Sequence, residues 1–82
     1  MTDTPTAEAI AQHYKAMGHS VDLINDIVAG NQDSDKDAAE RQATVDRNVE
    51  HLQIMLAQDF WTNEDMTAAN AAITAGNGYT AS

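Results

Sequence analysis

The sequence has no cysteine, a single proline, few basic side chains and no long apolar run. Without cysteine, the chain can form neither a disulfide nor a thiolate-ligated zinc or iron–sulfur site. Thirteen acidic residues outnumber four basic ones, which gives a net charge of −9 and argues against direct binding to nucleic-acid phosphates or to an anionic membrane surface. No apolar stretch approaches the ~20 residues that a membrane span needs.

The beginning of the chain and its length set further expectations. The stretch MTDTPTAEA has neither the basic flank nor the apolar core of a signal peptide, so we expect a soluble, intracellular protein. Eighty-two residues allow one small domain with a thin core, and such domains often gain stability by self-association. We therefore expect a single domain over residues 1–82, with a homo-oligomer as an open alternative to a monomer.

Apolar residues recur at helical spacing near the start of the chain. With Thr4 as the N-cap and Pro5 in the first turn, the pattern predicts a helix over 5–29. This helix is either bent or divided at Gly18, and Gly30 supplies a left-handed stop. Its stripe consists of Ala7, Ile10, Tyr14, Met17, Val21, Ile24 and Val28.

A second apolar stripe predicts a helix over 35–59, capped by Asp35. Its members are Ala38, Val45, Val49, Leu52, Leu56 and Phe60, widened by Ala39, Ile54 and Met55. Because only about five residues separate the two helices, we expect them to form an antiparallel hairpin.

A third, shorter helix is predicted in FWTNEDMTAANAAITAG. Thr62 can be its N-cap, with Asp65 in the capping-box position three residues later. Trp61 and Met66 have the spacing of a hydrophobic staple, and Gly76 ends the helix. The tails 1–4 and 77–82 are expected to be frayed, with docking of Tyr79 as the alternative.

The acidic stretch GNQDSDKDAAE resembles the start of a calcium loop. Counting from Asp33, the alternating carboxylates of Asp35 and Asp37 match, but the sixth position is Ala38 instead of glycine and the twelfth is Thr44 instead of glutamate. We favour a helix cap by Asp35, with Asp37 in the first turn, over a calcium-responsive switch. The sequence thus predicts no metal site and no cofactor.

Catalytic constellations are also not indicated. Ser20 follows a histidine directly, which is a poor geometry for a nucleophile and its base. Asp22 and Asp26 share a helix face, and a pair of like charges at this spacing favours a solvated surface over acid–base chemistry. None of His13, His19 and His51 has metal-binding spacing. His13 and His51 lie beside the apolar stripes and are interpreted as boundary residues. We predict that the protein is not an enzyme.

Large aromatic and exposed acidic residues remain as candidates for binding a partner protein. Phe60 and Trp61 lie at a helix–helix corner, where they can anchor a partner or, as we favour, close the core. Tyr14 and Met17 lie in the middle of the first stripe, which can serve the hairpin core or a seam between two chains. The candidate partner-binding residues are Tyr14, Met17, Asp22, Asp26, Phe60 and Trp61.

The segment RNVEHLQIMLAQDFWTNEDMTAANAAITAG, residues 47–76, resembles the C-terminal part of small uncharacterised proteins encoded by marine cyanophages. It covers about a third of the chain. Its most distinctive part is Asp59-Phe60-Trp61 followed by Asp65-Met66. The resemblance implies a viral accessory protein, located in the host cytoplasm or the virion, with no assigned activity.

The sequence as a whole predicts an all-α protein, built from an antiparallel hairpin of two long helices and a short third helix. The third helix closes the hairpin, and dimerisation into a larger helical bundle is the alternative. We expect a role in protein–protein interaction, either as a phage structural or assembly component or as an inhibitor whose acidic surface imitates nucleic acid.

Overall fold

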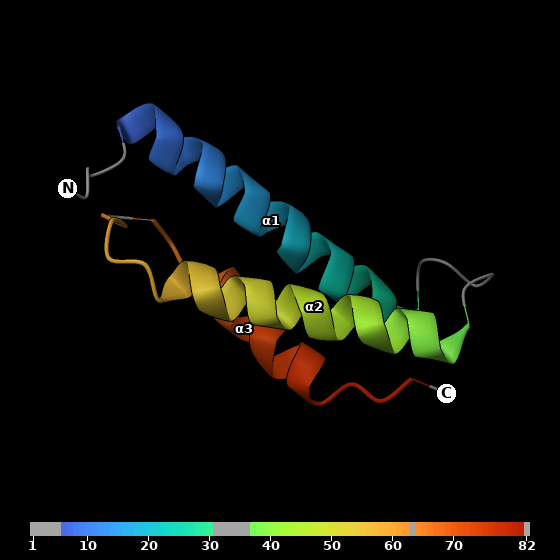
Figure 1. The fold of residues 1–82 in the computed structure, drawn as a ribbon. Coiled ribbons are helices and arrows are strands. Elements are labelled where there is room, and N and C mark those ends of the chain that lie inside the picture. The colour runs from blue at the N-terminus through green and yellow to red at the C-terminus, as the bar shows by residue number, and fades with distance from the viewer. Residues whose placement is uncertain (1–5, 31–36, 63, 82) are drawn as a thin grey trace.

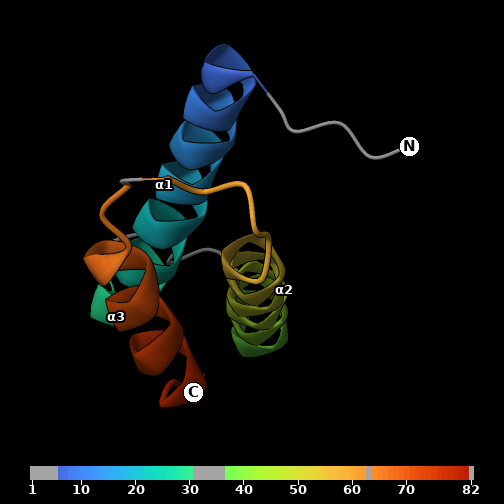
Figure 2. The ribbon, with the colours of Figure 1, turned by 90° about the vertical axis from the view of Figure 1, so that its left-hand side faces the viewer.

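Three α-helices form the part of the chain that the computed structural model describes, which comprises residues 6–30, 37–62 and 64–81. The helices are α1 (Ala7–Ala29), α2 (Ala38–Leu56) and α3 (Thr67–Asn77). In Figure 1, α1 and α3 run from left to right and α2 runs from right to left, so that α2 is antiparallel to both neighbours. Each helix packs against the other two (Figure 2). The predicted all-α fold, with two long helices and a shorter third, is confirmed.

Helix α1 begins at a cap two residues later than predicted. The Thr6 hydroxyl oxygen accepts a hydrogen bond from the Ala9 N–H at 3.1 Å, so the cap is Thr6 and not Thr4, which lies outside the described residues. The helix is continuous through Gly18 and ends at Gly30, whose φ of 77° is the left-handed conformation predicted for this stop.

Helix α2 shows the same displacement of its cap. The Asp37 carboxylate accepts the Glu40 N–H at 2.8 Å, which makes Asp37 the N-cap and corrects the assignment to Asp35. Asp33 and Asp35 lie outside the described residues, so the calcium-loop comparison has no structural counterpart here. The helix ends at Leu56, three residues before the predicted boundary at 59.

Helix α3 differs most from its prediction. The capping box of Thr62 and Asp65 is wrong, because the helix starts at Thr67 and the Thr62 N–H is bonded to the Glu64 carboxylate at 2.7 Å. Asp65 instead accepts the Thr67 N–H at 2.9 Å and thereby satisfies a donor of the first turn. Gly76 does not end the helix but is buried inside it.

The core lies between the three helices, and α1 and α2 each contribute more residues to it than α3 does. Val28 and Ile54, which were assigned to the apolar stripes, are exposed instead. On α1, Ser20 and Ile27 are buried beside the predicted stripe, because a helix that packs on two neighbours needs a wider buried face. The core cluster comprises Met17, Val21, Ile24, Ile27, Val45, Val49, Leu52, Met55, Ala69 and Ala72.

Small residues on α3 allow it to approach α2 closely. Its buried positions are Ala69, Ala72 and Gly76. A Cβ atom built on Gly76 would collide with Cγ2 of Val49 and lie 3.3 Å from Cγ1 of Val45. Gly76 is therefore a contact point between helices, where the sequence suggested only a helix stop.

The segment after α3 is held against α2. Gln42 donates from Nε2 to the Tyr79 carbonyl at 3.3 Å and accepts the Ala81 N–H at 2.8 Å. The Tyr79 side chain packs against the core cluster. The tail 77–82 was expected to be frayed, with docking of Tyr79 as the alternative. For Tyr79, the structure shows the docked arrangement.

Candidate partner-binding site

Four aromatic rings meet where the first half of α1 faces the loop between α2 and α3. We call this group the aromatic corner; it consists of His13, Tyr14, Phe60 and Trp61. The ring centroids of Phe60 and Trp61 are 4.7 Å apart, those of His13 and Phe60 5.3 Å, and those of Tyr14 and Trp61 6.3 Å, the last in an edge-to-face arrangement. Separations and tilts of this kind are favourable for aromatic pairs.

Trp61 fixes the loop to the end of α2. Its indole N–H donates to the Met55 carbonyl at 2.7 Å, and the ring packs against the core cluster. Met55 belongs to the last turn of α2, and its carbonyl also accepts the N–H groups of Ala57 and Gln58 at the helix end. Trp61 and Phe60 are both half-buried, so neither is fully covered by the rest of the chain.

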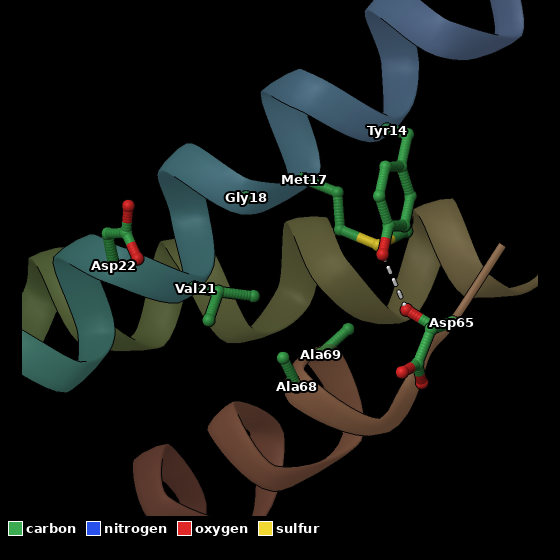
Figure 3. A pocket seen from close by; sticks show the side chains of 8 residues that line it. All are labelled: Tyr14, Met17, Gly18, Val21, Asp22, Asp65, Ala68 and Ala69. Carbon is green, nitrogen blue, oxygen red and sulfur yellow. Dashed lines mark hydrogen bonds between the residues drawn. The ribbon is translucent and has the colours of Figure 1, made fainter.

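Tyr14 connects α1 to the start of α3. Its hydroxyl donates to the backbone carbonyl of Asp65 at 2.8 Å, across 51 residues of sequence (Figure 3). The side chain is 37% exposed and belongs to the aromatic corner on one side. On its other side it forms a wall of a pocket.

This pocket lies between α1 and the first turn of α3 and has a volume of about 180 Å³. Figure 3 shows Tyr14 and Met17 on its α1 side, opposite the methyl groups of Ala68 and Ala69 on α3. Gly18 leaves open space, since a Cβ at this position would meet nothing within 4 Å. The pocket is lined by Tyr14, Met17, Gly18, Val21, Asp22, Asp65, Ala68 and Ala69.

The charged residues lining the pocket are both acidic. Asp22 and Asp65 are exposed and lie at opposite ends of the pocket (Figure 3). The Thr67 hydroxyl and then its N–H lower the pKa of Asp65 by hydrogen bonding to the carboxylate. The Thr62 N–H similarly lowers the pKa of neighbouring Glu64. These hydrogen bonds favour the charged forms of Asp65, which lines the pocket, and of Glu64, which does not.

Comparison with known proteins gives no match. No family model, curated protein or solved structure matches this chain. The function must therefore be inferred from the residues and geometry of the site.

The structure brings most of the sequence-predicted partner-binding residues together. Tyr14 joins Phe60 and Trp61 in the aromatic corner. Met17 is only 2% exposed, so a ligand can reach it only through the pocket that it lines. Asp26 is half-buried on α1 and does not line the pocket.

Sequence reasoning missed the α3 side of the pocket. Ala68 and Ala69 carry no functional signal, and Asp65 was assigned to a cap. Gly18 was read only as a weak point of the helix. The pocket is formed by residues about fifty positions apart, and no local pattern predicts that Tyr14 bonds to the Asp65 carbonyl.

Side chains of types that can ligate metals or act as nucleophiles also occur among the described residues. No group of three or more of their histidine and acidic side chains could hold a metal ion. Ser20 Oγ lies 3.3 Å from Nδ1 of His51, a contact between α1 and α2 that the sequence did not indicate. Ser20 is only 6% exposed, which leaves its hydroxyl inaccessible to a substrate and makes this contact a link between helices.

Proposed function

We propose that this protein acts by binding another protein, and that the aromatic corner together with the neighbouring pocket forms the binding site. The observation that carries the proposal is their continuity through Tyr14, which contacts the Trp61 ring and also lines the pocket. Aromatic anchors beside a concave site are typical of the energetic centre of protein interfaces. The partner is a larger protein or a second copy of this chain.

The role that we favour is that of a structural or assembly component. In the phage context that the sequence resemblance implies, the partner would be a capsid or tail protein. The half-buried rings of Phe60 and Trp61 support this role, because apolar anchors suit a lasting contact. The chain would then bury its remaining aromatic surface by packing on that partner.

The second candidate is an inhibitor that occupies a basic site on a host protein. It is supported by the net charge of −9 and by the exposed carboxylates of the pocket rim. Complementary charge accelerates association and is screened by salt. This function would make affinity for the partner strongly dependent on ionic strength.

Site-specific photocrosslinking tests whether the aromatic corner binds a protein. Phe60 is replaced by p-benzoylphenylalanine, and the same group is placed at exposed Glu50 on α2 as a control. Circular dichroism first checks that both variants fold. After irradiation of the purified protein and of an extract from the encoding organism, we expect adducts from position 60 and not from position 50. Twice the chain mass identifies a second copy, whereas a larger defined mass identifies another protein.

Equal labelling from both positions, or no adduct from position 60, would refute the proposal. Salt then separates the two roles. Between ~0.1 M and ~1 M salt the Debye length falls from ~10 to ~3 Å. The adduct of an assembly component should persist over this range, while that of an acidic mimic should disappear.

A further inference from the structure

The geometry points to an arginine side chain of the partner protein as the group that enters the pocket between α1 and α3. This inference rests on the proposed function, because the arginine belongs to a protein that also contacts the aromatic corner. It adds the chemical identity of the recognised residue. Three properties of the pocket support it, namely its size, its walls and its charge.

The size of the pocket fits one side chain. Its volume of about 180 Å³ is below the ~300–1,000 Å³ of typical small-molecule sites. A cavity of ~150 Å³ in another protein is large enough for a benzene ring. The pocket therefore accommodates a single long side chain that projects from a protein surface.

The walls suit the stem and the plane of a guanidinium group. Met17 and Val21 provide an apolar floor, against which three methylene groups of an arginine can pack. The Tyr14 hydroxyl is fixed by its bond to the Asp65 carbonyl, so the ring is held in place before a ligand arrives. Guanidinium groups stack on aromatic faces of this kind.

The charge of the rim distinguishes arginine from an apolar residue such as leucine. Asp22 and Asp65 are the charged lining residues, and both are acidic. An apolar occupant would partly desolvate these carboxylates without compensating them, whereas a guanidinium group can pair with either one. The net charge of −9 also favours the approach of a basic partner surface.

Peptide titration monitored by NMR tests this inference directly. The probe is acetyl-Leu-Arg-Leu-amide, and the matched control is acetyl-Leu-Gln-Leu-amide, which has the same apolar flanks without the charge. We expect the arginine peptide to shift the amide signals of Val21, Ala68 and Ala69. The glutamine peptide should bind several-fold more weakly.

Charge variants locate the binding. Asp22→Asn should weaken the binding of the arginine peptide by about twofold to fivefold, which is the effect expected from losing one partly exposed ion pair. Glu50→Gln changes the net charge equally but lies on α2, which contributes no lining residue, and should have a smaller effect. Asp65 is not mutated, because its carboxylate also holds the first turn of α3.

A pocket-filling variant provides an independent test. Gly18→Leu should reduce peptide binding by about tenfold or more while the helix forms, since open space surrounds a Cβ at this position. Gly18→Ala, which adds one methyl group, is the milder variant in case leucine disturbs folding. Both are checked by circular dichroism before titration.

Several results would overturn the inference. These are equal binding of the two peptides, equal effects of the Asp22 and Glu50 variants, or signal shifts that leave the pocket residues unaffected. If n-butylguanidinium binds more tightly than the arginine peptide, the pocket belongs to a free small cation and not to a protein. A failed titration together with a persistent crosslink from position 60 would reject the arginine but leave the protein-binding function intact.

Discussion

Replacing Trp61 by alanine should destabilise the protein by about 2–4 kcal/mol. Truncation of a fully buried tryptophan typically costs ~3–5 kcal/mol, and the half-buried Trp61 ring should contribute part of this through its contact with the core. Loss of the indole hydrogen bond to Met55 removes a further ~0.5–1.5 kcal/mol. The Met55 carbonyl keeps the N–H groups of Ala57 and Gln58 as donors, so no unsatisfied acceptor adds to this loss.

Urea denaturation followed by far-ultraviolet circular dichroism measures this change in the free energy of unfolding, because that signal comes mainly from the helical backbone and remains in a variant without tryptophan. Trp61→Phe is the comparison variant, because it keeps most of the aromatic surface and loses the indole N–H group. We expect this variant to cost about 1 kcal/mol, the value of one hydrogen bond. If Trp61→Ala costs less than about 0.5 kcal/mol, the ring has no structural role and is purely an exposed anchor. If Trp61→Phe costs as much as Trp61→Ala, the hydrogen bond and not ring packing holds the loop.

Two further predictions concern α3 and the loop that precedes it. Gly76→Ala should destabilise the protein by up to about 2 kcal/mol in urea denaturation, because a clash with buried Val49 costs ~1–3 kcal/mol and alanine regains ~1 kcal/mol of helix propensity. Gly78→Ala, whose Cβ would meet only ordinary contacts, lacks the clash and should not destabilise. The carboxyl groups of Glu64 and Asp65 should titrate below their ordinary pKa values of 4.5 and 3.8 in carbon-detected NMR. Because the pKa values of both carboxyl groups are lower in the folded state, their ionised forms stabilise the fold. This contribution to the free energy of unfolding is complete at pH values above the ordinary pKa values and is lost as the pH falls through the folded-state pKa values. Titration midpoints at or above 4.5 for Glu64 and 3.8 for Asp65 would contradict the described hydrogen bonds.

The helices were predictable because their apolar spacing is long and regular, whereas their first residues were not. Thr4 and Thr6, like Asp35 and Asp37, are equally good caps two residues apart, and local preference alone cannot choose between them. The structure selects the second member of each pair. This displacement shortens both helices without changing which face is buried.

The start of α3 was mispredicted for a different reason. The pattern around Thr62 is a good local signal for a helix, but two side-chain-to-backbone hydrogen bonds, one of them long-range, hold this segment as a loop. Trp61 is bound to Met55, and the Asp65 carbonyl accepts from Tyr14. Tertiary contacts thus override the local preference, and the same contacts create the pocket that the sequence did not reveal.

The glycine inside α3 also determines where this helix can sit along its axis. Val49 on α2 projects toward Gly76, the one residue of α3 without a Cβ atom. Sliding α3 by one turn would bring Ala72 to the same place, and its methyl group would meet the valine. The translational position of α3 is therefore selected by side-chain volume. The Ala68 and Ala69 side of the pocket depends on that position, although it lies two turns away.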